Sequence, residues 1–171
     1  GDSTFGHSGL SSLLNTAYNK GAGTVCILDN RTTAMTGRQG NPFNGVTLQN
    51  RESREMDLEG LVRALGIEDV QTVDPHNAEA VRTALKEATH RADDLSVIVF
   101  RAPCVLLERK RKPAFEVTSA CTGCGVCATL GCPAISKDAE TGVAFVDASL
   151  CIGCGQCAQY CKFGALVSTE A

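Results

Sequence analysis

An eight-residue stretch, Cys121-Thr122-Gly123-Cys124-Gly125-Val126-Cys127-Ala128, recurs 30 residues later as Cys151-Ile152-Gly153-Cys154-Gly155-Gln156-Cys157-Ala158. Each copy is followed by one further cysteine, Cys132 after the first and Cys161 after the second. Eight of the 10 cysteines of the chain therefore fall between positions 121 and 161. This repeat decides the fold of the C-terminal third, and its spacing indicates what it holds.

Three thiolates on one tight loop are difficult to use in a zinc site, because structural zinc usually takes C-x2-C pairs from separate segments. A cubane [4Fe–4S] cluster has several iron corners, and such a loop can serve three of them. Glycines at 123, 125, 153 and 155 let the backbone wrap closely around a cluster. Zinc and a disulfide framework are the alternatives, and nothing in the sequence marks the chain as secreted. The repeat thus favours iron–sulfur clusters.

Across about 50 residues the repeat resembles the ferredoxin-like 2[4Fe–4S] domain, a small α+β fold. In that family the fourth ligand of each cluster comes from the other copy. The resemblance implies one cluster on Cys121, Cys124, Cys127 and Cys161, and a second on Cys151, Cys154, Cys157 and Cys132. The sequence departs from the family in two places: four residues rather than three precede Cys132, and Lys162 stands where proline is expected.

Composition restricts the function further. Hydrophobic residues make up 43% of the 171 residues and charged residues 20%, which excludes a wholly disordered chain. The net charge of -3 predicts no nucleic-acid partner, and no apolar run is long enough to predict a membrane span. Because the chain begins with a motif rather than a leader, we expect a soluble, cytoplasmic piece of a longer protein.

The part before the repeat alternates helical and strand patterns. Helices are expected from Ser8 to Gly21, over 58–65 and from Asp74-Pro75 onward, and strands over 24–28, 70–73 and 95–100. The first strand reads as buried on both faces, with Cys26 in the core; Cys104 is also expected there. Residues 31–55 are polar and too long for an ordinary connection, which indicates a functional loop. The order predicts an α/β layer with a parallel sheet, and one further strand is expected before Gly1.

Charge separates two units. Residues 1–115 carry 14 basic and 14 acidic side chains, whereas residues 116–171 carry 2 and 5. We expect an α/β domain over 1–107, a basic linker over 108–115 and the cysteine-rich domain over 116–171. The basic linker reads as a solvated connection, with contact to an anionic ligand as the alternative.

Polar residues follow two expected strands at the same edge of the sheet. Gly1-Asp2-Ser3 is separated by 25 residues from Asp29-Asn30, and parallel α/β sheets bind ligands beyond the carboxyl ends of their strands. A carboxylate and an amide oxygen suit Mg²⁺ held together with phosphates. The helix expected near Ser8 would direct its positive N-terminus at the same anion. The arrangement predicts a diphosphate site.

This pair resembles the thiamine diphosphate motif, Gly-Asp-Gly followed about 25 residues later by Asn-Asn. The resemblance implies that Asp2 and Asn30 bind Mg²⁺ by side chain and Thr32 by its carbonyl oxygen, with Gly1, Ser3 and Thr33 at the cofactor. His7 could face the thiazolium or the substrate carbonyl; otherwise it is a helix-start residue bonded to backbone.

Taken together, the order Gly1-Asp2-Ser3-Thr4-Phe5, then the stretch from Ile27 to Gly37, then the cysteine repeat is similar to the large subunit of indolepyruvate:ferredoxin oxidoreductase. The fold implied is part of a doubly wound thiamine diphosphate-binding domain followed by a 2[4Fe–4S] domain. The function implied is oxidative decarboxylation of arylpyruvates to acyl-CoA and CO₂, with electrons passing through two [4Fe–4S] clusters to an external ferredoxin.

The same resemblance implies a smaller partner subunit and a catalytic base upstream of Gly1. Residues 38–42, Arg-Gln-Gly-Asn-Pro, depart from the family and put the substrate preference in question. The alternatives are a sister enzyme acting on pyruvate or another 2-oxoacid, and an electron-transfer subunit without thiamine chemistry.

Overall fold

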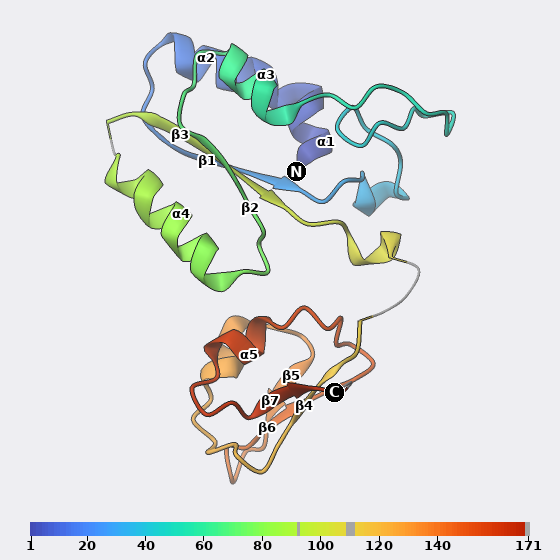
Figure 1. The fold of residues 1–171 in the computed structure, drawn as a ribbon, viewed down its shortest axis with the longest axis vertical. Coiled ribbons are helices and arrows are strands. Elements are labelled where there is room, and N and C mark those ends of the chain that lie inside the picture. The colour runs from blue at the N-terminus through green and yellow to red at the C-terminus, as the bar shows by residue number, and fades with distance from the viewer. Residues whose placement is uncertain (92, 109–111, 170–171) are drawn as a thin grey trace. The chain divides into compact units, whose positions relative to one another are not determined.

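The computed structural model describes residues 1–91, 93–108 and 112–169. The chain divides into two compact units, Gly1–Leu107 and Glu108–Ala171 (Figure 1). The basic segment expected as a linker falls in part on residues 109–111, which lie outside the described residues. Within the described residues, no helix is both long and apolar enough to cross a membrane.

The first unit is built on a parallel sheet. Its strands are β1 (Gly23–Asp29), β2 (Val70–Val73) and β3 (Leu95–Arg101), in the order β1-β3-β2. Both pairs of neighbouring strands are parallel, as the alternation of helices and strands predicted. In Figure 1, α2 (Leu10–Tyr18) and α3 (Leu58–Ala64) lie on one face of the sheet, and α4 (Ala78–His90) lies on the other. This arrangement confirms the expected α/β fold.

Strand β3 places alternate side chains in two cores. Val97 and Val99 pack among residues of the first helices, including Phe5, Leu13 and Val62. Ile98, one residue out of phase, packs against Ala84 and Ala88 of α4. A central strand covered on both faces must be apolar throughout, which accounts for the continuous run Val97–Val99.

Two expectations about where helices begin are wrong. The opening helix begins at Asp2 rather than Ser8: α1 (Asp2–Thr4), a π-helical turn over Phe5–Gly9 and α2 follow one another without a break. Ser8 lies inside this helical run, where its hydroxyl donates to the carbonyl of Thr4 at 3.4 Å. Helix α4 begins only at Ala78, because the side chain of Asn77 caps it by accepting from the N–H of Ala80.

Strand β1 is buried on one face only. Ile27 and Asp29 are buried, whereas Leu28 is 60% exposed and Cys26 is exposed. β1 is an edge strand, and α4 leaves these two side chains uncovered. Cys26 is therefore not a core residue, and Cys104 is half-buried.

The second unit pairs strands from both copies of the repeat. In the first copy β4 (Phe115–Val117) precedes the cysteine loop and β5 (Ile135–Lys137) follows it; in the second, β6 (Ala144–Val146) and β7 (Leu166–Ser168) take these places. β4 pairs with β7 and β5 with β6, both antiparallel, so each small sheet contains one strand of each copy. The helical turns also correspond, a 3₁₀ turn over Val126–Leu130 and α5 (Gln156–Tyr160).

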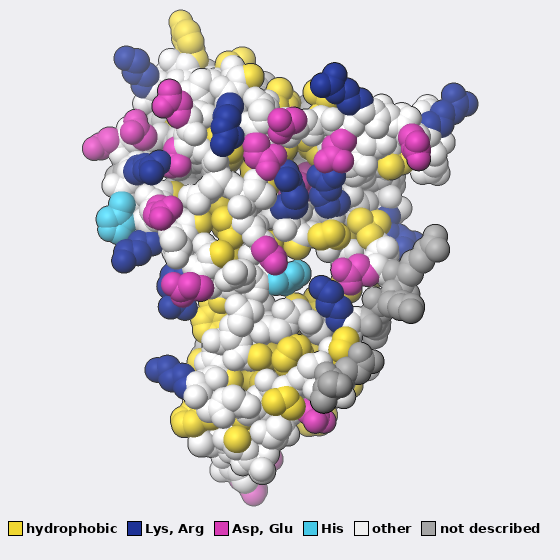
Figure 2. Space-filling model, viewed as in Figure 1, with side chains coloured by type: hydrophobic (Ala, Val, Ile, Leu, Met, Phe, Trp, Pro, Cys, Tyr) yellow, Lys and Arg dark blue, Asp and Glu magenta, His cyan; other side chains and the backbone are white. Residues whose placement is uncertain are grey.

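The two units also differ in surface. Acidic and basic side chains are interspersed over the visible face of the first unit, whereas that of the second is mainly hydrophobic and uncharged (Figure 2). Among the described residues of the second unit, Phe145 is 62% exposed and Phe163 is 50% exposed.

Candidate functional sites

Asp2 lies at the start of the opening helix and is only 2% exposed. Its Oδ2 accepts a hydrogen bond from the side-chain amide of Asn41 at 3.0 Å. Burial raises the pKa of Asp2, with a smaller contribution from Asp29, even though hydrogen bonds from Asn41 and from the Ser3 N–H lower it. No lysine or arginine side chain among the described residues forms an ion pair with Asp2. A buried carboxylate in this situation fits a divalent cation, which would relieve the cost of its charge.

The loop after β1 turns back toward this helix start. The side-chain oxygen of Asn30 accepts from the N–H of Thr32 at 3.2 Å, which closes a tight turn. Arg31 occupies the left-handed region in this turn, with φ of 64°. Thr33 then donates its hydroxyl hydrogen to the hydroxyl of Ser3 at 2.9 Å. The structure thus joins the Asn30–Thr33 turn to the helix start, and Thr32 between them is buried.

Asp29 has a different role from Asp2. It is 1% exposed, and its Oδ2 accepts from Nε of Arg101, the residue opposite it on β3, at 2.6 Å. Its Oδ1 accepts from the N–H of Arg31 at 3.1 Å. The guanidinium of Arg101 also donates two parallel hydrogen bonds, of 3.0 Å each, to the carboxylate of Glu59. Asp29 is therefore neutralised within the protein and fixes the turn that follows it.

Asn41, Glu59 and Arg101 were not expected from the sequence. Each of these residues lies far from the motif in the sequence but stabilises it in the fold. Asn41 donates a hydrogen bond to Asp2, and Arg101, which is itself bound by Glu59, donates one to Asp29. The one available signal was Arg101 at the end of an apolar strand, because a charge there needs a partner.

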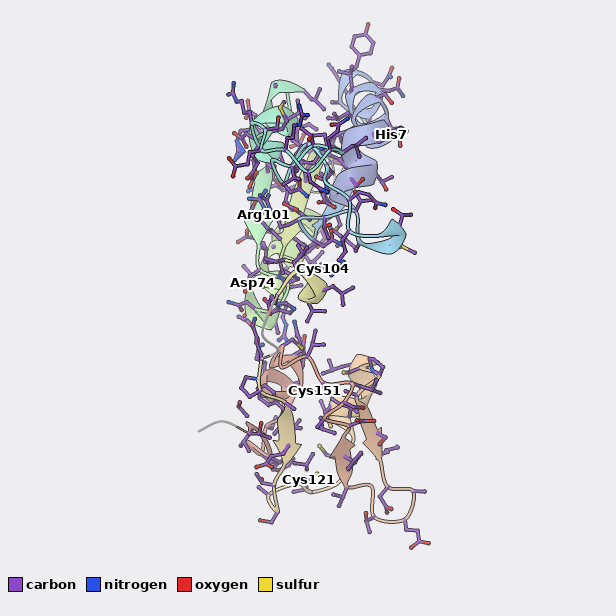
Figure 3. All side chains as sticks on the ribbon, turned by 90° about the vertical axis from the view of Figure 1, so that its right-hand side faces the viewer. His7, Asp74, Arg101, Cys104, Cys121 and Cys151 are labelled. Carbon is purple, nitrogen blue, oxygen red and sulfur yellow. The ribbon has the colours of Figure 1, made fainter. Side chains whose placement is uncertain are left out.

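His7 lies in the π-helical turn of the opening helix and is exposed (Figure 3). It lines an open cleft together with Ser3 and residues of the loop 40–56. Its expected role at the thiazolium or the substrate carbonyl stays a prediction.

The eight repeat cysteines form two groups. Cys121, Cys124, Cys127 and Cys161 line one small, mainly apolar cavity, with Leu166 and Phe163. Burial, with smaller contributions from the neighbouring thiols of Cys154, Cys151 and Cys132, raises the pKa of Cys157 to about 11. Both groups therefore combine three cysteines of one loop with one cysteine of the other copy. Cys121 and Cys151, which open the two loops, lie apart from each other within the unit (Figure 3).

Thiolates gathered in an apolar environment repel one another, so that these groups fit a cationic iron core better than free thiols. Backbone N–H groups also point at the sulfurs: that of Ala165 donates to Cys161 at 3.3 Å, and that of Phe115 donates to Cys151 at 3.5 Å. Among the described residues, no three His, Cys, Asp or Glu side chains are placed to hold a single metal ion.

Comparison with known proteins agrees with these two sites. Residues 1–100 match the family described as thiamine pyrophosphate enzyme, C-terminal TPP-binding domain, and residues 144–167 match the 4Fe-4S binding domain. The chain belongs to the family of thiamine pyrophosphate enzymes, and an iron–sulfur domain follows the cofactor-binding domain in its sequence.

Curated relatives combine both parts in one subunit. The chain is 41% identical to "Indolepyruvate oxidoreductase subunit IorA" of Pyrococcus horikoshii, over 96% of this chain and 26% of the relative. The IorA subunit of Thermococcus kodakarensis is also 41% identical, over 96% and 27%, and that of Archaeoglobus fulgidus is 38% identical, over 82% and 23%. The resemblance seen in the motifs is thereby confirmed. The chain spans about a quarter of the length of these relatives. No solved structure matches it.

Proposed function

We propose that this chain supplies the Mg²⁺–thiamine diphosphate site and two [4Fe–4S] clusters of a 2-oxoacid:ferredoxin oxidoreductase whose substrates are arylpyruvates such as indolepyruvate. In each turnover a 2-oxoacid and coenzyme A give an acyl-CoA, CO₂ and a proton, and the two electrons released reduce two ferredoxins. A smaller partner subunit completes the enzyme, which acts in the cytoplasm. The relatives named for indolepyruvate oxidation support this substrate class.

In this proposal the residues around Asp2 hold the cofactor. Asp2 and Asn30 bind Mg²⁺ by their side-chain oxygens and Thr32 by its carbonyl oxygen. Gly1, Ser3 and Thr33 lie against the diphosphate, where the hydrogen bond between Ser3 and Thr33 keeps the two segments together. Thiamine diphosphate, when bound, supplies the electron sink for decarboxylation, and the clusters supply acceptors for single electrons.

The observation that carries the proposal is a buried acid, Asp2, that forms no ion pair with any side chain in the described part of the chain, whose repeat cysteines gather into groups drawn from both copies. An electron carrier needs the cysteines and has no use for that acid. Asp2→Ala separates the two functions. The enzyme should lose Mg²⁺-dependent thiamine diphosphate binding with its iron content unchanged, and a carrier would bind no thiamine diphosphate before or after the change.

The test of the reaction is the rate of ferredoxin reduction by the full-length protein with its partner subunit. Indolepyruvate and phenylpyruvate should give higher kcat/KM than pyruvate. The reverse order would support the sister enzyme instead, and failure of every 2-oxoacid would contradict the proposal.

The 171-residue chain alone should bind clusters after anaerobic reconstitution and yet oxidise no arylpyruvate, because the base that activates the cofactor is expected on another domain. Iron analysis and the same ferredoxin assay check this prediction. Measurable turnover by the chain alone would contradict it.

A further inference from the structure

The loop over residues 40–56 forms one wall of a cleft beside the opening helix. Its backbone folds back on itself: the N–H of Ser53 donates to the carbonyl of Gly45, and that of Met56 to Pro42, both at 2.9 Å. Phe43, 1% exposed, anchors the loop against Gly6, where a Cβ would lie 2.8 Å from its ring. Between this loop and the helix lies a cleft of about 590 Å³ that opens to solvent. Ligand pockets for small molecules usually measure about 300–1,000 Å³.

The cleft adjoins the Asp2 site. Two of its lining residues belong to that site: Asn41 donates to Asp2, and Ser3 accepts from Thr33. A molecule in the cleft therefore lies next to whatever Asp2 and the Asn30–Thr33 turn hold. Asn41 belongs to the loop 40–56 and hydrogen-bonds to Asp2, so the loop contributes both to the cleft and to the Asp2 site.

The lining of the cleft is apolar and cationic. Arg54 and His7 are the ionisable side chains among its lining residues, and none of these residues is acidic. Within the described part of the chain, the Arg54 side chain forms no hydrogen bond or ion pair. Val46, Leu48 and Met56 line the same cleft, and they remain 38%, 79% and 46% exposed. An unpaired guanidinium beside exposed apolar side chains is complementary to a small anion with an apolar body.

We propose that this cleft binds the 2-oxoacid, with Arg54 pairing with its carboxylate and Val46, Leu48 and Met56 contacting its aromatic side chain. The inference rests on the proposed function and adds to it the residues that select the substrate. Coenzyme A fits less well, because its several phosphates call for several cations and the cleft offers one arginine.

Two substitutions separate the contributions. In the full-length protein with its partner subunit, Arg54→Met should raise KM for indolepyruvate, phenylpyruvate and pyruvate alike by about tenfold or more, because all share the carboxylate. Arg54→Lys should restore part of this loss. Leu48→Ser should raise the KM for the two aromatic substrates, whereas the KM for pyruvate should stay the same because pyruvate has no aromatic side chain. Both positions are exposed, so that folding is expected to be preserved.

Arg51→Met is the matched control, because Arg51 lies in the same loop, is exposed and does not line the cleft. Binding of 3-phenylpropionate, an unreactive aromatic carboxylate, gives a readout independent of turnover: equilibrium dialysis should show weaker binding to Arg54→Met and normal binding to Arg51→Met. In both variants, the affinity for thiamine diphosphate and the KM for coenzyme A should equal those of the unmodified protein.

The outcomes distinguish this inference from the proposed function. An unmodified protein that oxidises no 2-oxoacid contradicts the proposed function. An active protein in which Arg54→Met leaves every 2-oxoacid KM unchanged overturns the cleft assignment alone. A rise in KM for coenzyme A with constant 2-oxoacid KM also overturns it, since the cleft then belongs to the second substrate.

Discussion

At the scale of single residues, Asp2 and Asp29 show how two buried carboxylates a short distance apart acquire different roles. Asp29 is neutralised by Arg101, whereas the hydrogen bonds that Asp2 accepts come from the neutral side chain of Asn41 and the N–H of Ser3. Its charge therefore costs folding free energy: with a pKa raised above its ordinary value of 3.8, Asp2 stabilises the fold at low pH, and this contribution is lost as the pH rises through the folded-state pKa. A bound cation would offset that cost.

Asp2→Asn should lower the affinity for Mg²⁺-dependent thiamine diphosphate by about tenfold or more, because one charged ligand is lost. The protein without cofactor should unfold at an equal or higher temperature, since the amide has no charge to bury. Thermal unfolding with and without Mg²⁺ and thiamine diphosphate measures both effects. Glu68→Gln, an exposed change in the same unit, serves as the control; equal affinity in both variants would remove Asp2 from the site.

The pKa of Glu59 shifts in the opposite direction from that of Asp2. Burial alone would raise its pKa, but hydrogen bonds from Arg101 and Thr72 prevail and lower it to about 2 from 4.5. The stability it contributes is therefore complete above about pH 4.5 and is lost as the pH falls toward 2. Glu59→Gln should lower the free energy of unfolding at pH 7 by about 1–2 kcal/mol and flatten its decline below pH 4.5. Glu87→Gln, at an exposed position of α4, should retain that decline in the free energy of unfolding when it is measured in an acid titration.

The residues that hydrogen-bond to Asp2 and Asp29 show which part of the site the sequence could not predict. Asp2 and Asn30 could be singled out because they follow expected strand ends, and Thr33 was added by the resemblance to the thiamine diphosphate motif. Arg101 and Asn41 could not, since 72 and 39 residues separate them from the carboxylates they contact. Such pairings depend on the register of β1 with β3 and on the path of the loop, which a local pattern does not encode.

At the scale of elements, local sequence patterns predicted a helix or strand correctly where its own apolar periodicity was clear. The strand over Val70–Val73 and the helix that begins at Leu58 were predicted from their hydrophobic periodicity. The start of the first helix was misplaced because Ser8 resembles a cap, yet the helix already begins at Asp2. Strand β1 was misjudged for another reason: an apolar run signals burial only if an element covers each face, and α4 leaves Cys26 and Leu28 open.

The cysteine loops give a prediction at the same scale. Gly123 has φ of 71°, and a Cβ there would lie 2.7 Å from the carbonyl oxygen of Thr141. Gly131 has nearly the same φ of 67° but nothing within 4 Å of its Cβ position. Gly123→Ala should therefore displace the loop of Cys121 and Cys124 and lower iron incorporation, whereas Gly131→Ala should cost only about 1–2 kcal/mol of backbone strain and keep its iron. Iron and sulfide analysis after reconstitution distinguishes them, and equal iron in both would exclude a role for the close contact.

At the scale of the whole molecule, the two copies of the repeat cannot be separated into independent halves. Each small sheet takes one strand from each copy, and each group of thiols takes its fourth member from the other copy. The family match on residues 144–167 covers the second copy alone, so that its fourth cysteine, Cys132, lies outside the matched segment. Exchange of this kind makes the unit cooperative, because loss of one copy removes thiols and strands from both groups.

Exchange of ligands between the copies leads to a test on single cysteines. The unmodified chain should bind about eight irons after anaerobic reconstitution, as two four-iron clusters require. Cys161→Ser should remove or convert the cluster on Cys121, Cys124 and Cys127, and Cys132→Ser the cluster on the second loop, so that each variant retains about four intact-cluster irons. Electron paramagnetic resonance of the reduced protein should show two interacting clusters in the unmodified chain and one isolated cluster in each variant. Cys26→Ser and Cys104→Ser, outside the repeat, should keep the full signal. If Cys161→Ser instead disturbed the cluster of the second loop, each copy would hold its own cluster, and the ligand exchange proposed for this domain would be wrong.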